Sequence, residues 1–202
     1  MKHIFTLLLI AYTTTTHAQS YKDSLAKHRR HYKEDFIKEE RSPLKSNDTA
    51  NLRFFEPDIS YRVVADFTPT PDAQPFDMPT YSGKTKQFRQ YGVARFIIHD
   101  TIASLCVYQN LKLLNDKEHK NHLFIPFTDG TSYIESYAGG RYIDLETTDI
   151  KNGKLVIDFN KCYNPYCAYS TGYNCPVPPV ENRLQIAIKA GEMNYTGKHK
   201  EK

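Results

Sequence analysis

Residues 86–113 read KQFRQYGVARFIIHDTIASLCVYQNLKL, and this stretch decides the fold class. Apolar and polar residues alternate along it, as in β-strands that bury one face. Tyr91-Gly92 and His99-Asp100 have the composition of turns and would separate three strands over residues 86–91, 94–99 and 103–113. The stretch therefore predicts consecutive antiparallel β-strands.

The same pattern continues on both sides of this stretch. Further strands are expected at residues 61–67, 123–127, 133–137, 141–146, 155–160 and 183–189. Asp129-Gly130 and Asn152-Gly153 are typical of hairpin turns. Residues 69–79 carry four prolines and are expected to form a wrapping loop. These features predict a mainly β fold, either an antiparallel sandwich or a partly closed barrel.

The N-terminal region differs from the rest. It has the pattern of a signal peptide: a basic start, an apolar run from Ile4 to Tyr12 and a small-x-small site that ends at Ala18. Behind it, an apolar stripe that includes Leu25 and Phe36 recurs at helical spacing, which predicts an amphipathic helix packed on the domain. Ser42-Pro43 would end this helix. We expect a signal peptide at 1–18, a helix at 19–41, one β domain at 42–195 and a basic tail at 196–202.

Composition and charge narrow the function classes. The 202 residues carry a net charge of +4, which is weak evidence for a polyanionic partner, so no nucleic-acid partner is expected. No later run is long enough to cross a membrane, and an exported protein, periplasmic or extracellular, is predicted. Phosphate-binding loops, dinucleotide fingerprints and nucleophile elbows are absent from the sequence. His28 with His31 and His119 with His122 lack a carboxylate pattern, so neither a metal nor a cofactor is expected.

Four cysteines, Cys106, Cys162, Cys167 and Cys175, allow three disulfide pairings. A bond between Cys167 and Cys175 closes a short loop that is worth about 2.6 kcal/mol in the chain-entropy description. A zinc site built from Cys162, Cys167 and Cys175 lacks a nearby fourth ligand. In an oxidising compartment the disulfide is favoured over zinc.

Two segments stand out as candidate binding regions: FTDGTSYIESYAGGRYIDL at 127–145 and the polar, tyrosine-rich part of 155–192. The second is too polar and proline-rich for a strand, and a long loop with this composition is either functional or covers an opening in a sheet. The candidate binding residues from the two segments are Asp129, Thr131, Tyr137, Arg141, Tyr142, Asp158, Asn160, Tyr163, Asn164, Glu181 and Asn182.

Three hypotheses use these residues. The first is a pocket for a small or extended ligand, in which Arg141 pairs with a carboxylate or phosphate and the phenols stack on a ring. Alternatively, Arg141 binds no ligand and forms an internal ion pair with Asp158. The second is a hydrolase that uses Asp129 or Asp158 together with Glu181 as a carboxylate pair. The third is a structural partner of another protein in a cell-envelope assembly.

The motifs in these segments also resemble a known family. These motifs are FTDGT from Phe127, YAGGRY from Tyr137, DFN from Asp158, YNPYC from Tyr163 and CPVPP from Cys175, followed by ENRL and AGE. Together they resemble the uncharacterised bacterial and archaeal domain-of-unknown-function 1684 family. The resemblance covers roughly residues 21–192 and implies no reaction. It places Cys167 and Cys175 on motif positions. Cys106 and Cys162 do not lie on such positions, and they remain an optional second pair.

Overall fold

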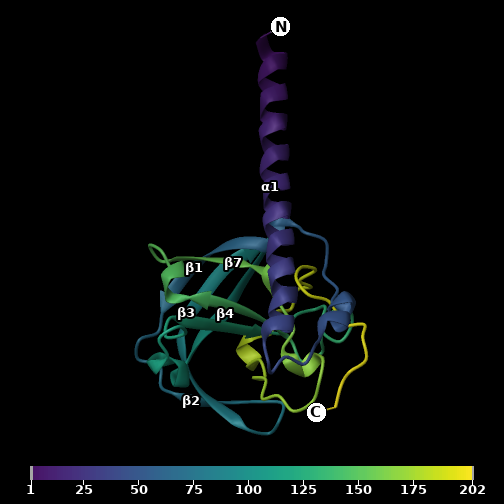
Figure 1. Cartoon of the computed structure of the whole chain (residues 1–202). Coiled ribbons are helices and arrows are strands. Elements are labelled where there is room, and N and C mark those ends of the chain that lie inside the picture. The colour runs from purple at the N-terminus through teal and green to yellow at the C-terminus, as the bar shows by residue number, and fades with distance from the viewer. Residues whose placement is uncertain (1, 202) are drawn as a thin grey trace.

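The computed structural model describes the backbone of residues 2–201 and the side chains of residues 19–201. In this part of the chain one long helix accompanies a single seven-stranded antiparallel sheet that curls into a half-barrel (Figure 1). The strand order is β6-β5-β4-β3-β1-β7, and β2 pairs with β3. The elements are α1 (Lys2–Lys38), β1 (Arg62–Pro69), β2 (Phe76–Pro79), β3 (Thr85–Ile98), β4 (Thr101–Asn110), β5 (His122–Phe127), β6 (Arg141–Glu146) and β7 (Lys154–Asp158).

The stretch that decides the fold forms the central hairpin, β3 and β4. His99 and Asp100 have φ angles of 46° and 62°, and Ile98 pairs with Thr101, so the predicted two-residue turn is confirmed. The turn expected at Tyr91-Gly92 is wrong. β3 continues through it with a register shift between Gln90 and Gly92, because a bulge adds a residue without reversing the chain.

Two predicted strands are wrong. Residues 133–137 and 183–189 form no strand, only isolated bridges at Ser136 and Arg183, and Asp129-Gly130 is not a hairpin turn, because β5 pairs with β6 instead. The Asp129 carboxylate accepts from the backbone N–H of Thr131 and of Ile188 at 2.7 and 3.1 Å. Backbone bonds replace a regular ladder elsewhere: the N–H groups of residues 134–136 donate to the Thr131 carbonyl, and Leu184 donates to Thr128 at 2.8 Å. The expected alternation survives, since Leu184 and Ile188 are buried.

The inner face of the sheet carries the main core, which includes Phe67, Phe96, Leu105, Ile125 and Phe159. A second cluster around Phe88, Tyr108 and Phe124 lies where β2 joins the sheet. The predicted loop at 69–79 therefore contains a short strand, because Phe76 and Met78 alternate with polar residues and pack on that cluster. β2 lies off the main strand path as an edge strand paired with β3, and Pro79 is tolerated at such an edge.

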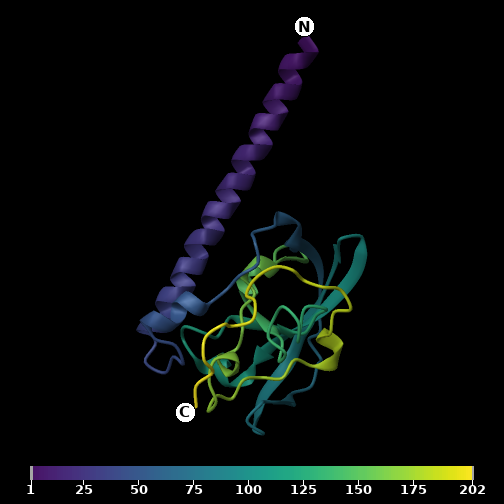
Figure 2. The ribbon, with the colours of Figure 1, turned by 90° about the vertical axis from the view of Figure 1, so that its right-hand side faces the viewer.

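Helix α1 lies against the domain with its second half only. Leu25 and Phe36 from the predicted apolar stripe are 1% and 2% exposed, while Ile37 is 53% exposed. Figures 1 and 2 show the first half extending away from the domain. The helix begins at Lys2, earlier than predicted, and the side chains of the expected signal peptide lie outside the described residues. Among the residues described, no helix is both long and apolar enough to cross a membrane.

The predicted disulfide is present between Cys167 and Cys175. Cys106 is half-buried and Cys162 is buried, and both are free thiols. The optional second pair is therefore not formed. Cys162 belongs to the core of the half-barrel, whereas Cys106 packs on the second cluster, so the two thiols lie in separate parts of the interior.

Candidate functional site

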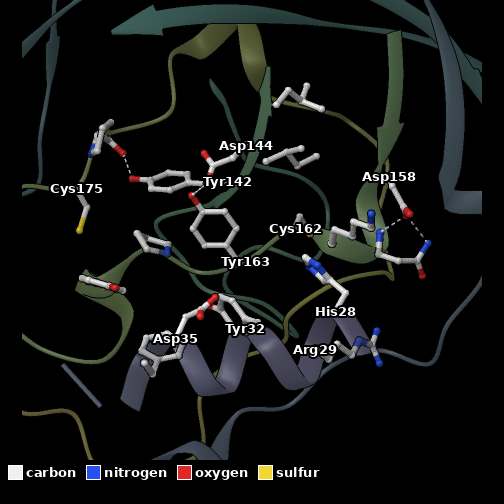
Figure 3. A pocket seen from close by; sticks show the side chains of 18 of the residues that line it. His28, Arg29, Tyr32, Asp35, Tyr142, Asp144, Asp158, Cys162, Tyr163 and Cys175 are labelled. Carbon is white, nitrogen blue, oxygen red and sulfur yellow. Dashed lines mark hydrogen bonds between the residues drawn. The ribbon is translucent and has the colours of Figure 1, made fainter. Parts of the chain in front are cut away.

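A cleft of about 1100 Å³ lies where the half-barrel is open. β6 and β7 are the two end strands of the sheet, and residues of both line the cleft, together with the loop at 160–176. A further wall is α1, which contributes His28, Tyr32 and Asp35 (Figure 3). The cleft therefore exists because the sheet does not close and the helix covers the opening.

Tyrosine rings form one side of this cleft. The ring of Tyr163 lies 6.0 Å from that of Tyr32 and 5.9 Å from that of Tyr142, centroid to centroid. The Tyr163 hydroxyl donates to Asp144 at 2.6 Å, and the Tyr142 hydroxyl donates to the Pro176 carbonyl. Burial raises the pKa of both phenols well above the usual value, so they stay neutral. With their hydroxyls bonded within the protein, these residues offer aromatic surface rather than free donors.

A buried carboxylate fixes α1 at this position. Glu192 is 0% exposed and accepts hydrogen bonds from Tyr32 and Tyr169 at 2.8 and 2.6 Å, and from the Asn164 backbone N–H at 2.9 Å. Burial raises its pKa to about 7 in spite of these bonds. Glu192 belongs to the AGE motif and precedes a basic tail. Nothing in that local pattern predicts its contact with Tyr32, which lies 160 positions away in the sequence.

Basic side chains dominate the charge of the cleft. Its lining contains seven Lys or Arg residues and four Asp residues, an excess of three positive charges, against +4 for the whole chain. The basic residues are Arg29, Arg41, Arg62, Lys86, Lys112, Lys151 and Lys161. Most of the net charge of the protein therefore surrounds this one cavity.

Only four of the predicted binding residues line the cleft: Tyr142, Asp158, Asn160 and Tyr163. Asp158 accepts from the Tyr21 hydroxyl at 3.0 Å and from the Asn160 backbone N–H at 3.1 Å. Tyr21 belongs to α1, so Asp158 is a second attachment point of the helix. Asn160 also bonds the backbone of Asp58, which ties the start of β1 to the end of β7.

The other predicted residues serve the interior. Arg141 is 0% exposed and pairs with Asp129 at 2.8 Å. The same guanidinium donates to the backbone carbonyls of Ile188, Ala190 and Glu192. Arg141 thus forms an internal ion pair, but its partner is Asp129 and not Asp158. It is not available to a ligand in the cleft.

The remaining candidates also have internal partners. The Thr131 hydroxyl donates to Asp129 at 2.7 Å, and Asn182 donates to the Cys106 and Pro126 carbonyls at 2.9 and 2.8 Å. Asn164 donates to the Met193 carbonyl at 2.8 Å, and Tyr137 donates to the Cys167 carbonyl at 3.3 Å. These residues hold the loops in place.

The carboxylates of the hydrolase hypothesis are not brought together. Asp129 is bonded to Arg141, Asp158 to Tyr21, and Glu181 accepts from the Tyr108 hydroxyl at 2.8 Å. Of the three, only Asp158 lines the cleft. Within residues 19–201 no group of three His, Cys, Asp or Glu side chains has the geometry of a metal site.

The model of a family described as protein of unknown function (DUF1684) matches residues 48–193. The chain belongs to this family. The matched part includes β6, β7 and the loop at 160–176 but begins after α1, so the family model covers one wall of the cleft and not the helix. The sequence resemblance is therefore confirmed for the β domain.

A solved structure supports the fold as well. The chain is similar to an uncharacterised protein of Haloarcula marismortui, determined by NMR in solution, with 31% sequence identity and a TM-score of 0.66. The alignment covers 87% of this chain and 95% of that one. No curated protein matches the chain.

Proposed function

We propose that the protein is an exported binding domain that takes a small or extended ligand in the cleft between α1 and the edge strands. The cleft itself carries the proposal: it has about 1100 Å³, aromatic rings along one side and an excess of basic groups. Ligand sites are concave, partly apolar and equipped with a few polar groups, and their volumes reach about 1000 Å³. Tyr163 would contact a ring of the ligand, which is the role expected for the phenols of its segment, and Tyr32 from α1 would contact the same ring.

A ligand screen by thermal shift tests this function, with variants that fill or spare the cleft. Val156 lines the cleft on the outward face of β7, and Val156→Trp would occupy part of its volume. Ile97 is on the outward face of β3, is 65% exposed and does not line the cleft, so Ile97→Trp is the matched control. Sugars, aromatic acids, phosphate esters and neutral aromatics would form the screened set.

We expect at least one class to raise the melting temperature. A ligand at 100 times its Kd stabilises the native state by about 2.7 kcal/mol, which corresponds to a shift of roughly 5–10 °C for a chain of this length. The shift should be lost in Val156→Trp and retained in Ile97→Trp. A ligand that stabilises both variants equally binds elsewhere and would contradict the proposal.

Export is the second part of the proposal. The signal-peptide pattern ends at Ala18, and the first half of α1 extends away from the domain (Figure 2). Cleavage there would leave the contacts of Tyr21, Leu25 and Tyr32 intact. Mass spectrometry of the secreted protein should give Gln19 as its first residue. Retention of residues 1–18 in the mature protein would contradict it.

A second candidate function is binding to another protein of the cell envelope. Val64, Ile97 and Ile102 are 61%, 65% and 69% exposed, and they lie on β1, β3 and β4, with Ile97 opposite Ile102. Exposed aliphatic side chains on adjacent strands favour a protein contact. Cross-linking in intact cells, compared between the native chain and Ile97→Asp, tests it: a partner captured equally by both would not use this face.

A further inference from the structure

The end of the cleft near β7 holds three basic side chains from three separate segments. His28 comes from α1, Arg62 from the start of β1 and Lys161 from the short 3-10 helix Phe159–Lys161. Arg62 lies directly opposite Asp158 in the β1–β7 pairing, so the start of β1 and the end of β7 form one rim. Figure 3 shows His28 pointing from the helix towards this rim, on the side where Asp158 lies.

The positive charge at this end is not neutralised within the protein. Among residues 19–201, neither Arg62 nor Lys161 has a carboxylate within 4.0 Å, and the ring of His28 has no hydrogen-bond partner. Asp158, which lies opposite Arg62, is bonded to Tyr21 and Asn160 instead. Arg62, Lys161 and the imidazole therefore share this end of the cavity with Asp158, a carboxylate that is already bonded.

The surroundings of His28 agree with this charge balance. Burial lowers its pKa, and the positive charge of Lys161 lowers it further, more than Asp158 raises it. The ring is therefore neutral at pH 7 and keeps one N–H to donate. An anion placed among the three groups would accept from all of them and remove the mutual repulsion of the cations.

We propose that this end of the cleft binds a phosphate group of the ligand, held by Arg62, Lys161 and His28. Three donors that approach from three segments suit a tetrahedral group with several acceptor oxygens, whereas a planar carboxylate offers two. The rest of the ligand would extend along Tyr163 and Tyr32, which face the same cavity (Figure 3). The ligand class is thus a phosphate ester that carries a ring, and the inference rests on the proposed binding function.

Binding of phenyl phosphate and of inorganic phosphate to the purified protein tests the inference. In proton–carbon correlation spectra, the imidazole signal of His28, assigned with His28→Gln, should shift as phosphate is added. The exposed ring of His119 gives the internal control, because it already bonds Asp116 at 3.1 Å and is not in the cleft. Sodium chloride at the same ionic strength should leave the His28 signal in place.

Variants localise the contact. Lys161→Met and Arg62→Gln should each weaken the binding of phenyl phosphate about tenfold, since each removes one charge-assisted hydrogen bond. Arg95→Gln is the matched control, because Arg95 is an exposed arginine of the same sheet that does not line the cleft, and its binding should change less than about twofold. Circular dichroism would verify that all three variants are folded.

Several outcomes would overturn the inference. A His28 signal that does not respond to phosphate, an equal loss of binding in Arg95→Gln, or benzoate binding as tightly as phenyl phosphate each contradict a phosphate site. If the screen yields a neutral ligand that Val156→Trp blocks, the proposed function stands while this inference fails. If phosphate binds outside the cleft and nothing in the screen is sensitive to Val156→Trp, both fail.

Discussion

Replacing Arg141 by methionine would be the most damaging single change among the polar residues of the interior. Arg141 is fully buried, pairs with Asp129 at 2.8 Å and donates to the Ile188 carbonyl at 2.8 Å and to the Glu192 carbonyl at 3.1 Å. Methionine fills much of the volume but offers no donor. The change would leave the Asp129 carboxylate and three backbone carbonyls without their charged partner.

The size of this effect follows from the burial. Breaking a buried ion pair by removing one partner costs about 3–5 kcal/mol, because an uncompensated charge stays in the interior. For a chain of this length, 1 kcal/mol corresponds to about 2–4 °C, so the melting temperature should fall by roughly 6–20 °C. Calorimetry and urea titration would measure the loss. Arg95→Met, which changes an exposed arginine, should stay within about 0.5 kcal/mol of the native chain.

A double-mutant cycle separates the ion pair from general damage to packing. Asp129→Asn removes the charge that Arg141→Met leaves unpaired, so the double variant should be more stable than the sum of the single losses by about 2 kcal/mol. If Arg141→Met does not fold, Arg141→Lys tests the pair instead, because lysine keeps the charge that pairs with Asp129 and should lose less stability. Additive losses, or a melting temperature of Arg141→Met within about 3 °C of the native value, would refute this explanation of the interior.

Three further predictions concern other buried features. Burial raises the pKa of Glu192 from 4.5 to about 7, so between these pH values the native state keeps a proton that the unfolded chain has released. The free energy of unfolding should therefore fall by roughly 3 kcal/mol as the pH rises from 4.5 to 7. Glu192→Gln should remove this slope in urea titrations, and an unchanged slope would assign it to other groups. Replacing Cys167 and Cys175 by serine should lower the free energy of unfolding by about 2.6 kcal/mol in non-reducing thermal melts. Under reducing conditions, this variant and the native chain should have the same stability. Gly191 has a φ of 75°, and a Cβ there would lie 2.3 Å from the Cys162 sulfur. Gly191→Ala should therefore lower the free energy of unfolding by about 2–4 kcal/mol in urea titrations, and a smaller loss would mean that the turn relaxes.

The sequence predicted the strands best where a turn requires a particular backbone. His99-Asp100 and Asn152-Gly153 adopt positive φ, as their composition indicates, and the strands beside them are where they were expected. It failed at residues 133–137, where alternation alone suggested a strand. Tyr133 has a φ of 73°, and the backbone there is bonded within its own loop. Alternation reports which side chains are buried but not which group bonds the backbone.

The candidate site was predictable only in part. Tyr163 and Asp158 were among the expected binding residues because they lie in a polar segment that is too irregular for a strand. His28, Arg62 and Lys161 were not, because each looks like an ordinary surface residue of its own segment. They meet only after the sheet has curled and α1 has packed across its open side, and no local pattern in the sequence encodes that meeting.

The clustering of tyrosines follows from the incomplete closure of the half-barrel. The free edge of β6 pairs with the loop at one point only, where the Tyr142 N–H donates to the Tyr163 carbonyl at 2.9 Å and the Tyr163 N–H donates back at 3.0 Å. Beyond that bridge the opening is covered by α1. Tyr32 bonds Glu192 and also lines the cleft, so one residue both attaches the helix and shapes the cavity. A ligand that contacts Tyr32 would therefore stabilise the docked helix, because it binds the folded chain in which Tyr32 lines the cavity.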